Sequence, residues 1–163
     1  MKTRGWLILL SLFILLGGGI TLAFQEVCVL QVENTEHPAK LLIRTAPAAR
    51  FSLSYINSIY LQPAAEDFQV GEGEEILLLG VRTRSPAVAA YYGFEEEKEY
   101  YPVNRTLKSF VLRLGMSQAQ VLSWANRQIS LGELGEPGDR LEVRVVRMTR
   151  GRYLLSSGKK ERG

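Results

Sequence analysis

Apolar and polar side chains alternate with a period of two along most of this chain, which is the pattern of half-buried β-strands. The clearest example is residues 140–147, with Leu141, Val143 and Val145 on one face and Glu142 and Arg144 on the other. Residues 50–58 repeat the pattern. Further strands are predicted at residues 27–32, 40–45, 67–70, 75–84, 110–114, 119–124 and 128–131, and residues 148–157 are predicted as a last edge strand.

Short segments rich in Gly, Pro, Asn and Asp separate these strands, as expected for turns. They lie at residues 33–38, around Pro63, at 71–73 and at 132–139. The part of the chain after residue 25 contains no segment with the clear period of an amphipathic helix. About eight to ten short antiparallel strands with turns between them predict an all-β fold, a single β-sandwich or a barrel-like domain.

Residues 85–102 depart from the strand pattern. They contain Tyr91 and Tyr92, then the acidic segment 95–99, then Tyr100 and Tyr101. We predict a long excursion from the sheet with room for a helical turn. Long excursions in compact domains often carry function.

The N-terminal segment is uniformly apolar. Residues 6–24, from Trp6 to Phe24, contain no charged side chain, and as a helix they would span about 28 Å, close to the hydrocarbon core of a bilayer. Lys2 and Arg4 precede the run, which predicts a single-pass protein with a cytoplasmic N-terminus and an extracytoplasmic domain. A signal peptide is the alternative, cleaved after Ala23 to release a secreted protein, because Thr21 and Ala23 are small residues.

The predicted organisation therefore has three parts: a signal anchor or signal peptide at residues 1–25, an extracytoplasmic β-domain at 26–157 and a basic flexible tail at 158–163. The length of 163 residues is enough for one domain and an anchor. The apolar content of 46% and the charged content of 23% are those of a folded protein.

Charge and metal-binding residues limit the possible functions. The net charge is +3, but Lys2 and Arg4 are two of the 20 basic residues, which leaves 18 against 17 acidic ones. This balance predicts no nucleic-acid partner. Because the chain has one cysteine (Cys28) and one histidine (His37), neither an internal disulfide nor a multi-histidine metal site is possible, and we predict no metal and no cofactor.

Polar residues gather where the strand at residues 50–58 ends. Asn57 and Ser58 follow Tyr55, and the chain returns with Glu66 after Pro63. Such a cluster is suited to binding a small ligand or a partner; alternatively, Asn57 and Ser58 satisfy backbone groups in a turn. Asparagine cannot act as a general base, so acid–base catalysis at Asn57 is disfavoured and no catalytic residue is predicted.

Tyrosines extend this candidate site, because they give a large contact area at a low entropy cost. In the alternative interpretation the tyrosines of the excursion cover one end of the sheet core. The predicted binding residues are Tyr55, Asn57, Ser58, Tyr60, Glu66, Tyr91 and Tyr92.

The same stretch resembles the uncharacterised bacterial domain-of-unknown-function family 1850. In that family a strand ends in Tyr-x-His-Ser-Val-Glu, and a Pro and then a Glu near an aromatic residue follow. The corresponding residues here are Tyr55, Asn57, Ser58, Ile59, Tyr60, Pro63, Glu66 and Phe68. The resemblance continues in Leu112-Arg113-Leu114-Gly115, Ile129-Ser130-Leu131 and Pro137-Gly138-Asp139-Arg140, and covers roughly residues 27–148. The family His is Asn57 here and the family Glu is Tyr60, so the resemblance does not extend to that pair.

Members of this family are small anchored or exported proteins, often encoded beside membrane subunits of TRAP carriers of the TAXI type. The resemblance implies a non-enzymatic accessory or regulatory protein that contacts the transporter membrane subunit or its solute-binding protein. A small-ligand-binding β module of the cell envelope is the alternative, and a cell-envelope enzyme is a weaker one. A cavity that reaches Asn57 and Glu66 would favour the ligand, whereas a flat, exposed aromatic patch would favour the partner.

Overall fold

The computed structural model describes residues 22–96, 98–116 and 120–157. Most of the predicted membrane span and the whole predicted basic tail lie outside these ranges. Within them, no helix is both long enough and apolar enough to cross a bilayer.

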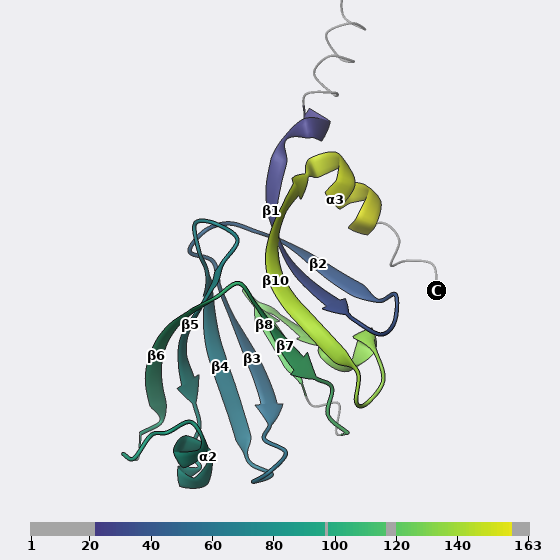
Figure 1. The fold of residues 1–163 in the computed structure, drawn as a ribbon. Helices are drawn as coiled ribbons and strands as arrows, with labels where there is room; N and C mark the ends of the chain where they lie inside the picture. Colours follow the sequence, from purple (N-terminus) through teal and green to yellow (C-terminus); the bar gives the residue numbers. More distant parts are fainter. Residues whose placement is uncertain (1–21, 97, 117–119, 158–163) are drawn as a thin grey trace, which may run out of the picture. The chain divides into compact units, whose positions relative to one another are not determined.

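Two antiparallel sheets make up most of the described chain, as predicted for an all-β domain (Figure 1). The first has the strand order β2–β1–β10–β7 and the second the order β6–β5–β4–β3–β8–β9. The first sheet contains β1 (Glu26–Asn34), β2 (Lys40–Thr45), β7 (Ser109–Arg113) and β10 (Arg140–Thr149). The second contains β3 (Arg50–Ile56), β4 (Pro63–Val70), β5 (Ile76–Arg82), β6 (Tyr100–Leu107), β8 (Val121–Trp124) and β9 (Arg127–Ser130).

Within the described ranges, short helical segments also accompany the sheets, among them α2 (Pro86–Tyr91), the 3-10 helix η1 (Leu131–Leu134) and α3 (Arg150–Ser157). The chain forms two compact units, one of which is Val29–Val146. In the other, α3 begins where the backbone N–H of Arg150 donates to the carbonyl oxygen of Gln25 at 2.7 Å.

Strand alternation correctly identified the inward faces. Leu141, Val143 and Val145 are at most 2% exposed, and Phe51 and Leu53 are 4% exposed. In the β3–β4 pair, Phe51 is opposite Phe68 and Leu53 is opposite Glu66. The inward row of β4 is therefore Ala64, Glu66, Phe68 and Val70.

Stacked phenylalanine rings connect the two sheets. The ring of Phe68 lies 5.0 Å from that of Phe51 on β3 and 4.7 Å from that of Phe110 on β7, with interplanar angles of 15° and 5°. Because β7 belongs to the first sheet, the inward faces of the sheets pack on each other at Phe68. Offset aromatic contacts of this kind add to the free energy gained by burying the rings.

Two predictions about strand boundaries are wrong. Pro63 is the first residue of β4 and not part of a turn, a position that suits proline because the first residue of a strand need not donate a ladder hydrogen bond. Residues 100–107, which were not predicted as a strand, form β6. This strand is at the edge of its sheet, where Pro102 is tolerated.

The predictions about helices are partly wrong. The excursion does contain a helical turn, α2, in which Ser85 Oγ accepts from the N–H of Val88 and Pro86 occupies the first helical turn. Residues 148–157 do not form an edge strand: β10 ends at Thr149 and α3 follows. The hydroxyl of Thr149 accepts from the N–H of Arg152 at 3.3 Å, so Thr149 caps this helix.

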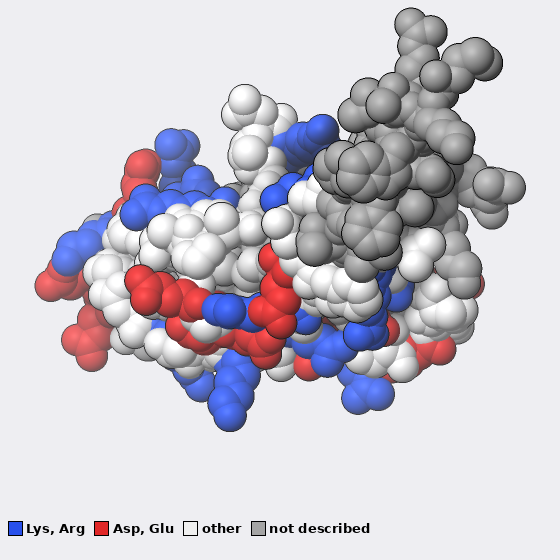
Figure 2. Space-filling view, turned by 90° about the horizontal axis from the view of Figure 1, so that it is seen from above, with Lys and Arg blue, Asp and Glu red and all other residues white. Residues whose placement is uncertain are grey.

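Acidic and basic side chains are interspersed over the face of the protein seen in Figure 2. Two of the ion pairs link neighbouring strands: Arg82 with Asp67 at 2.7 Å and Arg144 with Glu33 at 3.0 Å. Exposed pairs of this kind contribute little to stability, so burial of the apolar faces is the main stabilising term.

We expect Phe68→Ala to lower the free energy of unfolding by about 3–5 kcal/mol, because it removes a buried ring and both stacking contacts. The measurement is urea denaturation of the purified full-length protein. Phe68→Leu, which keeps most of the apolar volume, should lose clearly less. Equal losses for the two variants would contradict the prediction, because they would show that the apolar volume retained by leucine contributes nothing at this position.

Candidate functional site

Glu66 is the charged member of an otherwise apolar row. It lies on β4 between Ala64 and Phe68, which are 5% and 1% exposed. The register puts Leu53 directly opposite Glu66 and Tyr55 one position further along the same face. A tyrosine side chain is long enough to reach such a diagonal neighbour.

Two phenols surround this carboxylate. The hydroxyl of Tyr55 donates to Glu66 Oε1 at 3.0 Å, and the hydroxyl of Tyr92 donates to the same oxygen at 2.7 Å. The two hydroxyls also contact each other. Tyr92 is the C-cap residue of α2, so the helix of the excursion brings it to the strand pair.

Burial raises the pKa of both phenols above the usual value near 10. For Tyr55 the negative charge of Glu66 and the hydrogen bond with Tyr92 raise the pKa further. For Tyr92 the hydrogen bond with Tyr55 lowers the pKa, but burial is the larger effect. Both phenols therefore stay protonated at neutral pH and remain hydrogen-bond donors.

The cluster lies in a cavity of about 470 Å³ between the sheets, a size typical of small-molecule sites. Its walls come from β3, the loop after it, β4, α2 and β7. The cavity is lined by Leu53, Tyr55, Ile56, Asn57, Ser58, Glu66, Tyr91, Tyr92, the residues from Phe110 to Gly115, and Gln120.

Six of the seven predicted binding residues line this cavity, and Tyr60 does not. Tyr60 is 40% exposed in the loop after β3. The side-chain oxygen of Asn57 accepts from the N–H groups of Ile59 and Tyr60 at 3.0 Å each. Asn57 therefore holds the loop in shape, which is the alternative that the sequence left open.

Exposed apolar side chains lie in the lining of the cavity and in the loop after β3. Ile56, Tyr91 and Val111 line the cavity and are 42%, 57% and 58% exposed. Ile59 and Leu61, in the loop after β3, are 62% and 74% exposed. Exposed apolar side chains grouped around one site commonly mark a contact with a ligand or a partner.

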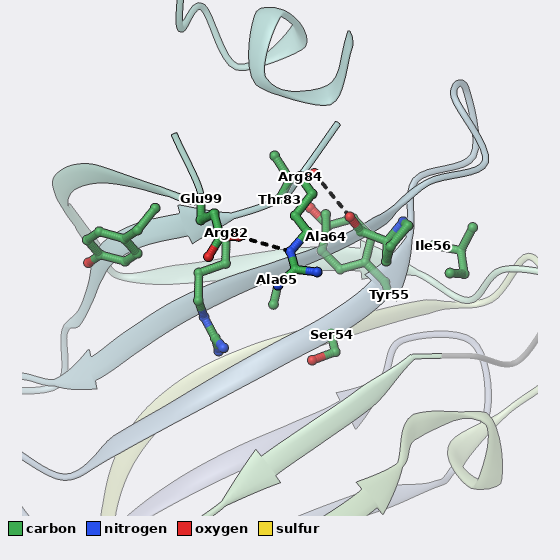
Figure 3. A pocket seen from close by; sticks show the side chains of 11 residues that line it. Ser54, Tyr55, Ile56, Ala64, Ala65, Arg82, Thr83, Arg84 and Glu99 are labelled. Atoms are coloured by element: carbon green, nitrogen blue, oxygen red, sulfur yellow. Dashed lines mark hydrogen bonds and ion pairs between the residues drawn. The ribbon is translucent and has the colours of Figure 1, made fainter. Parts of the chain in front are cut away.

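A second pocket, of about 570 Å³, lies on the outer side of the larger sheet (Figure 3). Its charged side chains are paired: Arg84 with Glu99 at 3.1 Å, and Arg82 with Asp67 through two hydrogen bonds. By contrast, no ion pair within the described ranges involves Glu66. The inner cavity therefore has the charge that is available to a ligand, although the outer pocket is larger.

The sequence did not indicate that β7 closes the cavity. Residues 110–114 were predicted as a strand, but the pattern does not say which element they face. Gln120 lies in the predicted strand 119–124 and is not among the predicted site residues. Its side chain accepts from the N–H of Gly115 at 3.0 Å and donates to the carbonyl of Arg113 at 2.7 Å, so it fixes the end of β7.

The fold and the site define an all-β domain of two antiparallel sheets with an open cavity between them and a carboxylate in that cavity. Across 22–96, 98–116 and 120–157, no group of three or more metal-ligating side chains is suited to hold a metal ion. Comparison with protein-family models, with curated proteins and with solved structures found no match. Membership of family 1850 thus stays a prediction that rests on the residues quoted above.

We expect the free energy of unfolding to fall as the pH rises above about 10. The pKa of Tyr55 and of Tyr92 is higher in the folded state than in the unfolded state. The contribution of these two groups to the free energy of unfolding is therefore fully present below the unfolded-state pKa, and it is lost as the pH rises through the folded-state pKa. In urea denaturation across this range, the double variant Tyr55→Phe, Tyr92→Phe should show a shallower decline. Tyr60→Phe, in which an exposed tyrosine is replaced, is the control. Equal slopes for wild type and the double variant would contradict the prediction.

Proposed function

We propose that this protein is a non-enzymatic binding module that takes a small ligand in the cavity at Glu66. The observation that carries the proposal is the cavity itself. It reaches Asn57 and Glu66, it has a volume of about 470 Å³, and it combines apolar walls with a few convergent polar groups.

The polar groups are arranged for binding. Glu66 and the two phenols are already connected by hydrogen bonds, so a ligand meets a preformed cluster. Preformed sites lose less conformational entropy on binding than sites that must be ordered by the ligand.

A cavity-filling substitution tests the proposal. Full-length protein in nanodiscs is screened against a library of small organic molecules by ligand-observed NMR. Leu112→Trp, in the wall of the inner cavity, should weaken the hits by at least about tenfold, a change of about 1.4 kcal/mol. Ser54→Trp, in the outer pocket, is the matched control and should bind as wild type does. The reverse result would move the site to the outer pocket, and the absence of any hit would count against the proposal.

A second candidate function is that of an accessory protein of a TRAP-type transporter, which the resemblance implies. The observation that favours a protein contact is the open edge of β7 beside the exposed apolar residues. The N–H of Leu114 donates to the carbonyl of Asp139 at 2.8 Å. Hydrogen-bonded positions alternate along an antiparallel strand. The backbone groups of Leu112 and Phe110 therefore also bond to β10, whereas those of Val111 point to the other edge of β7. No described strand lies at that edge.

An open edge of this kind can accept an extended segment of a partner. We propose that the segment of residues 6–24 holds the domain at the membrane beside such a partner. A tether of this kind raises the effective concentration of a membrane partner without a large interface.

Crosslinked affinity purification from native membranes tests this second function. Wild-type protein should recover a transporter membrane subunit or its solute-binding protein. The matched variant is Val111→Pro, which removes the edge N–H and should recover less. Recovery of no membrane protein above an unrelated anchored control would remove this candidate and leave the ligand-binding proposal intact.

A further inference from the structure

The Glu66 cluster consists of Glu66, Tyr55 and Tyr92, and its hydroxyl hydrogens are used in hydrogen bonds within the cluster. Tyr55 and Tyr92 each have one hydroxyl hydrogen, and their oxygens make three close contacts: two with Glu66 Oε1 and one with each other. Two hydrogens cannot supply a third bond, whichever way they point. The polar atoms of this cluster that remain for a ligand are therefore acceptors, namely Glu66 Oε2 and the lone pairs of the phenols.

Among the described residues, the negative charge of the cluster has no counter-ion in an ion pair. Glu66 is half-buried, and none of the ion pairs in the described ranges includes it. Arg113 also lines the cavity, but it alternates with Leu112 on β7, so its side chain lies on the strand face opposite to that of Phe110, which stacks on Phe68. A carboxylate removed from water is stabilised by a cation that donates hydrogen bonds.

We propose that the cavity binds a protonated amine with an apolar body. The ammonium group donates to Glu66 Oε2 and to the phenol oxygens, and the apolar body packs against Leu53, Phe110 and Leu112. This inference rests on the ligand-binding function proposed above and specifies its ligand class.

The aromatic side chains of the site suit the same ligand. The rings of Tyr91 and Tyr92, which both line the cavity, lie 5.6 Å apart with an interplanar angle of 90°. A ring face attracts a cation, whereas it repels an anion. A cation that meets the face of either ring is therefore favoured, and this is the same sign of charge that the carboxylate selects.

Three probes of similar shape test the ligand class: benzylammonium, benzyl alcohol and phenylacetate. They are titrated into the full-length protein in nanodiscs at neutral pH and followed by ligand-observed NMR. We expect benzylammonium to bind at least tenfold more tightly than benzyl alcohol, and phenylacetate to bind more weakly still. Leu112→Trp should abolish the benzylammonium signal, which separates cavity binding from partition into lipid.

The matched variants are Glu66→Gln and Glu95→Gln. Glu66→Gln keeps an oxygen for the two phenols and removes the charge, so it should weaken benzylammonium at least tenfold and leave benzyl alcohol nearly unchanged. Glu95 is exposed on the excursion, and Glu95→Gln changes the net charge equally, so it should have no effect. If Glu66→Gln does not fold, the relative affinities of the three probes for the wild-type protein still test the inference.

Several outcomes would overturn the inference while leaving the proposed function in place. One is that benzyl alcohol or phenylacetate binds in the cavity as tightly as benzylammonium. Another is that Glu66→Gln folds and binds benzylammonium as wild type does. A third is that none of the three probes binds although library molecules occupy the cavity. If neither probes nor library molecules bind, both the inference and the proposed function fail.

Discussion

Packing of Phe68 between Phe51 and Phe110 is the contact on which the two sheets and the cavity depend. It is the point where a ring from the larger sheet meets a ring from the smaller one. Glu66 is two residues before Phe68 on the same strand, so the contact that joins the sheets also sets the position of the carboxylate. Beyond Phe68 the sheets leave the space in which Glu66, Tyr55 and Tyr92 lie.

A carboxylate in an inward row is unfavourable for folding unless its oxygens are satisfied. The two phenols satisfy one oxygen of Glu66, and α2 is needed to supply one of them. A short helix in an excursion thus completes a site that begins on a strand pair. Local departures from good core design of this kind are expected where a protein binds something.

Much of the fold could be predicted from alternation alone, because a strand with one buried face must place apolar residues at every second position. Phe51, Leu53, Leu141 and Val143 were assigned to the inward faces on this basis and are buried. The errors arose at prolines and at a capping residue, because the structural role of these residues depends on their position in a strand or helix. Pro63 and Pro102 suggest turns when only neighbouring residues are considered, but one begins a strand and the other lies at a sheet edge.

The sequence by itself determined the period of the strands, and with it that Phe51, Leu53 and Tyr55 share one face of a strand. It could not determine which strand or helix faces them. That depends on the order of strands in the sheets and on contacts such as Phe68 with Phe110, 42 positions apart in the numbering, and no local pattern encodes these. The tertiary structure therefore decided that Tyr92 joins Glu66, that β7 closes the cavity, and that Tyr60 stays outside it.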